Sequence, residues 1–169
     1  MERDSERIIG VIMYSAISPD YTLRTIVFTD KRLLEIPLSK MSELITKTNE
    51  LPSVIASLFE AINPAIFSGL GNLVGLKLWK DLKKETQDKQ VVFDLEGDVP
   101  SELVKNAVRE LEYEKIKWVK LKKVSMSSDA YVGIGAGFWH STNIVFDGRA
   151  IGEVEALLLK TPLSVKLKN

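Results

Sequence analysis

The stretch TIVFTDKRLLEIPLSK, residues 25–40, limits most strongly what this chain can fold into. Two apolar runs rich in β-branched and leucine side chains flank the polar sequence Thr-Asp-Lys-Arg. Runs of this kind around a short polar link are typical of two antiparallel strands. Asp30-Lys31 fits a two-residue link, although Asn-Gly or Asp-Gly would favour a hairpin more strongly. We therefore predict strands at 22–29 and 33–38.

The preceding segment predicts a third strand. In residues 8–17, IIGVIMYSAI, both alternating sets of side chains are apolar, which is typical of a strand covered on both faces. The sequence SPDY then provides a turn, since Pro19 fixes φ and Asp20 can bond the local backbone. Pro37 places the end of the last strand at an edge or a bulge. The first forty residues thus predict a three-stranded antiparallel meander.

The composition changes at Met41. Helical segments are expected from Ser42, at 51–62 and from Asn63 to about residue 85, with Asn63 as cap and Pro64 in the first turn. The uncharged run 61–76 is sixteen residues long, which is below the length of about eighteen expected of a membrane span. We predict a helical insertion at about 41–114 that is buried or faces a partner.

The remainder predicts further antiparallel strands and two helices. Strands are expected at 89–97, 116–126, 130–138 and 143–148. A helix is expected at 101–113, capped by Asp98 or Ser101, because apolar residues recur there at helical spacing. A last helix is expected at 151–160. This order predicts a single α+β domain over 1–169, an antiparallel curved sheet or small β-barrel capped by a C-terminal helix.

Three segments resemble a known family. TIVFTDKRLLEI, EKIKWVKLKKVSM and NIVFDGRAIGEVEALLLK are similar to strands and to the capping helix of bacterial and archaeal pleckstrin-homology-like (GRAM-like) domains. The resemblance covers 8–40 and 116–160. It implies a PH-like β-barrel and a non-catalytic binding or assembly module. Lipid-binding members hold inositol phosphates with Lys and Arg near the first inter-strand loop, but here that loop contains Asp20 and no cation, so we expect no such pocket there.

Composition excludes several kinds of site. The chain has no cysteine and one histidine, so we expect no disulfide, no metal site and no cofactor. The formal net charge is zero, and the lysines around Trp118 lack regularly spaced aromatic residues, so nucleic acid is not an expected partner. The N-terminal sequence MERDSERIIG lacks the apolar core of a signal peptide, so we expect a cytoplasmic protein, with association at the membrane surface as the alternative.

A less favoured hypothesis is a small hydrolase that uses His140 as general base, with Asp147 as acid partner and Ser141 as nucleophile. Their spacing matches no known triad, so a surface or packing role for His140 is favoured.

Two sets of glycines stand out. Gly133, Gly135 and Gly137 recur at period two within an expected strand, where they would let a helix lie close. Gly69, Gly71 and Gly75 mark a small-residue helix face. We expect the two sets to pack on each other or on a second subunit.

Two binding surfaces are therefore predicted. The leading hypothesis is a protein-protein interaction or self-assembly module whose contact surface contains seven apolar residues. These are Leu58, Phe59, Ile62, Ile66, Phe67, Leu70 and Leu73. The alternative is a module for anionic lipid surfaces that uses Lys77, Trp79, Lys80 and Lys84. Asp81, Glu85 and Asp88 interleave with these lysines, which is also typical of a solvated helix end with internal ion pairs.

Overall fold

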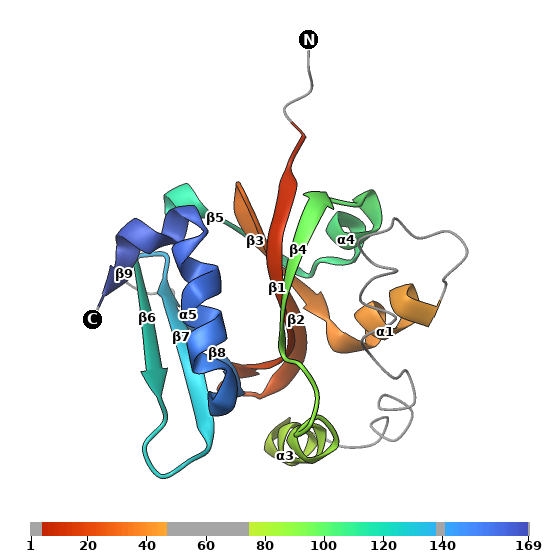
Figure 1. Ribbon diagram of the computed structural model, residues 1–169, viewed down its shortest axis with the longest axis vertical. Coiled ribbons are helices and arrows are strands. Elements are labelled where there is room, and N and C mark those ends of the chain that lie inside the picture. Colours follow the sequence, from red (N-terminus) through yellow and green to blue (C-terminus); the bar gives the residue numbers. More distant parts are fainter. Residues whose placement is uncertain (1–4, 47–74, 138–140, 169) are drawn as a thin grey trace.

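Nine strands form one continuous sheet within the residues that the computed structural model describes, which are 5–46, 75–137 and 141–168 (Figure 1). The strand order is β5-β3-β2-β1-β8-β7-β6-β9, and β4 pairs with β1 outside this path. All described pairings are antiparallel except that of β6 with β9. The predicted α+β fold with an antiparallel sheet and a C-terminal helix is therefore confirmed, and the sheet is open rather than closed.

The strands are β1 (Arg7–Ser18), β2 (Thr22–Thr29), β3 (Arg32–Pro37), β4 (Val92–Asp98), β5 (Arg109–Glu112), β6 (Trp118–Lys123), β7 (Asp129–Gly135), β8 (Ser141–Asp147) and β9 (Leu167–Lys168). The α-helices are α1 (Leu38–Thr46), α3 (Gly75–Glu85), α4 (Ser101–Asn106) and α5 (Ile151–Leu159). The described residues also form the short 3-10 helices η3 (Tyr113–Lys115), η4 (Gly148–Ala150) and η5 (Pro162–Lys166). The predicted three-stranded meander corresponds to β1, β2 and β3.

Strand β1 joins two parts of the sheet. One edge pairs with β2, while the other is divided between β4, which pairs with residues 7–12, and β8, which pairs with residues 16–18. Its register with β2 shifts between Ile8 and Gly10 and again between Ile12 and Ser15. Such bulges bend a strand and increase its twist. The bend lets a single 12-residue strand serve both parts.

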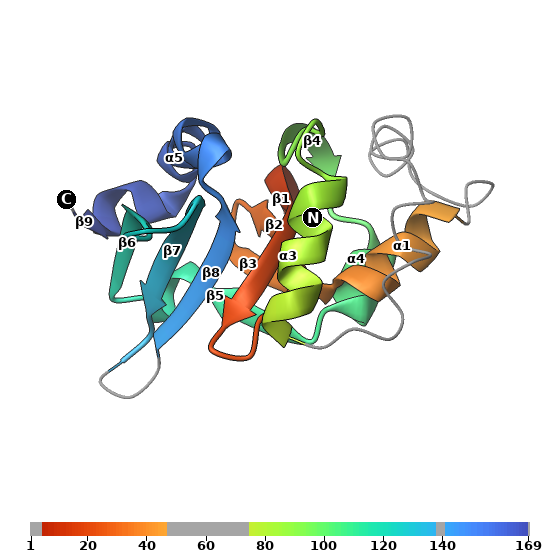
Figure 2. The ribbon, with the colours of Figure 1, turned by 90° about the horizontal axis from the view of Figure 1, so that it is seen from below.

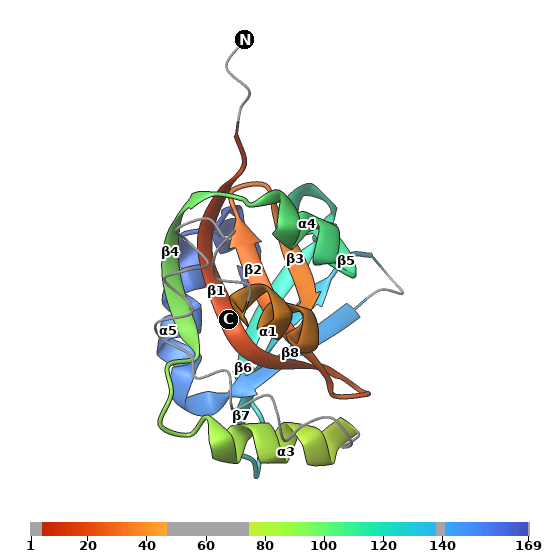
Figure 3. The ribbon, with the colours of Figure 1, turned by 90° about the vertical axis from the view of Figure 1, so that its right-hand side faces the viewer.

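Both faces of β1 are covered, as its sequence predicts. Residues 11–16 are all buried. Helix α5 contacts β1, β4 and β6, whereas α1 contacts β2 and β3 (Figures 2 and 3). Gly10 makes the α5 contact possible, because a Cβ there would lie 2.5 Å from the Leu157 Cδ1 atom and 2.9 Å from the Phe93 carbonyl oxygen.

The segment 101–113 differs from its prediction. Helix α4 ends at Asn106, and β5 follows and pairs with β3, so that Leu111 lies opposite Leu33. The sheet edge thus overrides a helical pattern, because pairing satisfies the backbone and buries Leu111. Neither Asp98 nor Ser101 caps the helix; Pro100 occupies the N-cap position without a side-chain hydrogen bond.

The predicted insertion at 41–114 is not purely helical. Its described part contributes β4 and β5 to the sheet, in addition to α1, α3 and α4. The strand predicted at 89–97 corresponds to β4. Residues 47–74 lie outside the described part of the chain.

A tryptophan, rather than a helix, covers the glycines of β7. Trp118 of β6 pairs with Gly135, and a Cβ on Gly135 would lie only 2.1 Å from the Trp118 Cε2 atom. A Cβ on Gly133 would lie 3.3 Å from the same ring. The expected helix contact is therefore wrong for these two positions, and its other partners, Gly69 and Gly71, lie outside the described residues.

Gly135→Val is expected to destabilise the protein by about 1–3 kcal/mol, because the added side chain displaces the Trp118 ring. Gly152→Ala is the matched control, since a Cβ there meets nothing within 4 Å and α5 gains helix propensity. The control should leave the stability unchanged or raise it by up to about 1 kcal/mol. Urea unfolding monitored by circular dichroism measures both, and equal stabilities of the Gly135→Val variant and the wild type would contradict the packing described.

Candidate functional site

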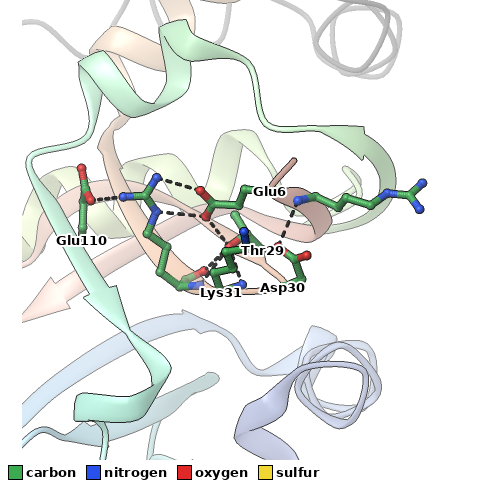
Figure 4. A network of polar contacts seen from close by, with 7 residues as sticks. Glu6, Thr29, Asp30, Lys31 and Glu110 are labelled. Carbon is green, nitrogen blue, oxygen red and sulfur yellow. Dashed lines mark hydrogen bonds and ion pairs between the residues drawn. The ribbon is translucent and has the colours of Figure 1, made fainter. Parts of the chain in front are cut away.

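The Thr-Asp-Lys-Arg turn is a structural junction (Figure 4). The Thr29 hydroxyl oxygen accepts the backbone N–H groups of Lys31 at 3.1 Å and Arg32 at 2.9 Å. The Arg32 guanidinium donates two hydrogen bonds to the Glu6 carboxylate, at 2.9 and 2.7 Å, and also contacts the Glu110 carboxylate. The turn thereby ties the segment before β1 to β3 and β5.

In this network the Arg32 guanidinium is already engaged by two carboxylates, those of Glu6 and Glu110. Burial alone would raise the pKa of Glu6, but hydrogen bonds from Arg32 and Thr29 hold that pKa below its usual value. The bond to Glu6, with the nearby charges, raises the pKa of Arg32. The adjacent hollow is also lined by carboxylates from Glu6, Asp30, Glu112 and Glu114. The positive charge of Arg32 is thus neutralised by carboxylates of the same chain.

A second charged cluster lies between strands. Glu35 of β3 is buried, and its carboxylate lies 3.4 Å from the Arg109 guanidinium of β5. Arg109 also donates a hydrogen bond to the Thr142 hydroxyl of β8 at 2.5 Å, which links two separate parts of the sheet. Burial raises the pKa of Glu35, although Arg109 and Arg24 act in the opposite direction. The cluster is an internal cross-link between β3, β5 and β8.

Helix α3 is anchored by a buried carboxylate. Trp79 is 1% exposed, and its indole N–H donates to the Asp129 Oδ2 atom at 3.3 Å. The Lys83 ammonium donates to the Asp129 Oδ1 atom at 2.5 Å and to the Ser128 hydroxyl at 2.7 Å. The same ammonium lies 5.9 Å from the centre of the Trp79 ring. These contacts fix the rotation of α3 about its axis.

The prediction that Trp79 lies on an anionic-surface face is therefore wrong. Trp79 and Leu82 are three residues apart on one side of the helix, and both are buried against the sheet. The large apolar ring gains more from burial than from exposure, and Asp129 satisfies its N–H group. The three predicted lysines lie on the exposed side.

Lys77, Lys80 and Lys84 are exposed and line a hollow of about 530 Å³. Lys83 and Arg149 contribute further cations to its wall, and Asp81 and Asp147 contribute carboxylates. Within the described part of the chain, none of the ammonium groups of Lys77, Lys80 and Lys84 forms an ion pair. The internal pairing expected from the interleaved charges is thus not seen there. We call this hollow the α3 hollow.

Three other charged residues of the α3 hollow, Asp147, Arg149 and Lys83, are paired with opposite charges. The Asp147 Oδ1 atom accepts the Arg149 backbone N–H and Nε–H groups, both at 3.0 Å, and its Oδ2 atom accepts a third bond at 2.9 Å. Burial would raise the pKa of Asp147, but these bonds from Arg149 hold it below its usual value. Lys83 is similarly compensated by Asp129. An incoming anion would therefore meet three lysines that no described residue pairs with, opposed by the carboxylate of Asp81.

The other residues predicted to form a site are those of the apolar contact surface and of the hydrolase hypothesis. The seven apolar residues of the predicted protein-binding surface lie outside the described residues, as does His140. Asp147, the proposed partner of His140, is bonded to Arg149. Within 5–46, 75–137 and 141–168, no group of three His, Cys, Asp or Glu residues could hold a metal ion. In the same ranges, no helix combines the length and apolar character needed to cross a bilayer.

Comparison with protein-family models, curated proteins and solved structures gives no match to this chain. The pleckstrin-homology-like assignment therefore stays a prediction.

Sequence analysis predicted Lys77, Lys80 and Lys84 as site residues but did not predict the other charged residues that line the α3 hollow. Lys83 falls outside the i, i+3, i+7 pattern, and Arg149 lies 65 positions beyond Lys84 (149 − 84). Asp129 is 50 positions from Trp79. The one local indication in the sequence is the amphipathic pattern of α3, in which Trp79 and Leu82 lie on one side and the lysines on the other.

Two glutamates should show opposite effects of pH on stability. The pKa of Glu6 is lowered in the folded protein, so its contribution is present above the unfolded value near 4.5 and is lost as the pH falls through the folded value. The pKa of Glu35 is raised, so its contribution is present below 4.5 and is lost as the pH rises through the folded value. The advantage of wild type over Glu6→Gln should shrink between pH 7 and pH 3.

Over the same range, wild type should gain stability relative to Glu35→Gln. Denaturant unfolding of the three proteins at both pH values measures these changes. If both variants showed the same pH trend relative to wild type, the environments assigned to the two carboxylates would be wrong.

Proposed function

We propose that this protein is a non-catalytic binding module that recognises a phosphate-bearing anion in the α3 hollow. The observation that carries the proposal is the convergence on one hollow of Lys77, Lys80 and Lys84, which form no ion pair with any residue that the structure describes. Phosphate oxygens accept charge-assisted hydrogen bonds from ammonium groups, and several ammonium groups can share one phosphoryl group. A ligand with two or more negative charges uses such a site best.

Preorganisation supports the proposal. Helix α3 is held by Trp79 and Lys83 on Asp129, so the backbone carrying the three lysines is fixed before a ligand arrives. Each flexible lysine side chain still loses entropy on binding, which limits the affinity for a small anion. We therefore expect binding that is moderate in strength and sensitive to salt.

The proposed site differs from the one that the family resemblance implies. Lipid-binding pleckstrin-homology-like domains use cations near the first inter-strand loop, whereas that loop contains Asp20 here. Gly75, at the start of α3, lies against the Asp20 backbone, since a Cβ on Gly75 would be 3.3 Å from the Asp20 carbonyl oxygen. Lys77, Lys80 and Lys84 thus come from a segment outside the resemblance, whereas Arg149 lies within it. The protein-protein interaction hypothesis rests on residues that are not described and stays a prediction.

The test replaces the charges of the three lysines together. A variant with Lys77→Gln, Lys80→Gln and Lys84→Gln should bind inorganic pyrophosphate roughly tenfold or more weakly than wild type, because it loses the uncompensated cations. Isothermal titration calorimetry at low salt measures the affinity. The matched control changes three exposed lysines elsewhere, Lys105, Lys117 and Lys168, to glutamine and should retain the wild-type affinity.

This design separates local from global electrostatics, because both triple variants lower the net charge equally. Equal loss of affinity in the two variants would show a non-specific effect and contradict the proposal. Unchanged affinity in both, or no binding by the wild type, would also contradict it.

A further inference from the structure

The turn between β6 and β7 carries a fully exposed apolar side chain. Met126 has a relative exposure of 106% and a φ of 63°. Few residues other than glycine adopt this left-handed conformation, and Asn, Asp or Gly suit it best. Ser125, Ser127 and Ser128 surround Met126 and are exposed too. The turn geometry therefore does not explain an apolar residue at this position.

The turn is held in place beside the α3 hollow. The Val124 N–H group donates to the Asp129 carbonyl oxygen at 2.9 Å, and the Gly148 N–H group donates to the Ser128 carbonyl oxygen at 2.8 Å. The Lys83 ammonium reaches the Ser128 hydroxyl at 2.7 Å. Met126 thus sits two residues from a contact with α3, on a turn bonded to both α3 and η4.

Cations and a second exposed apolar residue accompany Met126. Lys122 and Lys123 are exposed at the end of β6, and Leu76 on α3 is 45% exposed. Leu76 precedes Lys80 by four residues and therefore lies on the same side of the helix. Figures 1 and 3 show α3 and the β6–β7 turn at the same end of the molecule, opposite the N-terminus. We call this region the α3 end.

We infer that the α3 end docks on a phospholipid bilayer that contains anionic lipids. The lysines contact headgroup phosphates, and Met126 and Leu76 enter the interface. This inference rests on the proposed function, since it makes the headgroup the phosphate-bearing anion. A free phosphate would occupy the α3 hollow and leave Met126 in water, whereas a bilayer offers negative charge beside an apolar interior.

Acidic residues of the α3 end weaken its attraction to anionic lipids. Asp81, Glu85 and Asp88 oppose the lysines, so the surface should need a substantial fraction of anionic lipid and low salt. Vesicles of neutral lipid alone should bind poorly. This dependence separates electrostatic docking with apolar insertion from purely hydrophobic adsorption.

A single-cysteine label tests the geometry directly, because the natural chain contains no cysteine. Met126→Cys is labelled with an environment-sensitive fluorophore and mixed with vesicles of phosphatidylcholine containing phosphatidylglycerol. The emission should shift to the blue and return at high salt. Val165→Cys is the matched control, since Val165 is 87% exposed but lies in η5, beside β9. Its emission should not shift.

Two further measurements make the outcome decisive. Met126→Ser should bind the same vesicles several-fold more weakly in co-sedimentation, while its affinity for pyrophosphate stays at the wild-type value. Pyrophosphate binding without vesicle binding would overturn the membrane inference and leave the proposed function standing. Vesicle binding that is insensitive to Met126→Ser, an equal shift at Val165, or a dimer that depends on Met126 in light scattering would also overturn it.

Discussion

Strand β1 is the element on which the rest of the fold depends. It pairs along one edge with β2, and its other edge passes from β4 to β8. The two register shifts near Gly10 and after Ile12 bend the strand, so both groups of neighbours can pair with it. Gly10 has a further role, because it leaves room for Leu157 of α5. Without this bend, the two parts of the sheet would be separate.

Charged groups in this protein serve two different purposes. Arg32, Arg109, Arg149 and Lys83 are each paired with a carboxylate and connect elements of the fold. Lys77, Lys80 and Lys84 have no such partner among the described residues and face the solvent around one hollow. The anchoring of α3 on Asp129 separates these groups, because it places Trp79 inward and the three lysines outward. Formal neutrality of the whole chain therefore conceals a local excess of cations.

Much of the local structure could be predicted from the sequence, because it follows from periodicity. The continuous apolar run in residues 8–17 and the β-branched and leucine-rich runs in residues 22–38 predicted β1, β2 and β3, and the apolar spacing in 151–160 predicted α5. Long-range pairing could not be predicted in the same way. Residues 109–112 have a helical pattern but pair with β3 at the edge of the sheet, and Trp118, rather than the expected helix, fills the space over Gly135. The buried position of Trp79 depends on its hydrogen bond to Asp129. Asp129 is distant in the sequence, so the local pattern of α3 could not predict this contact.

The most direct test of the central claim is to locate the bound anion. In an NMR titration of the isotope-labelled chain with pyrophosphate, amide chemical-shift changes should concentrate in α3, in residues 126–129 and at Gly148 and Arg149. Residues around Asp30 and Arg32 should change little, because the charge of Arg32 is neutralised within the fold. Shift changes centred on the Thr-Asp-Lys-Arg turn, or the absence of localised changes in α3, would contradict the account.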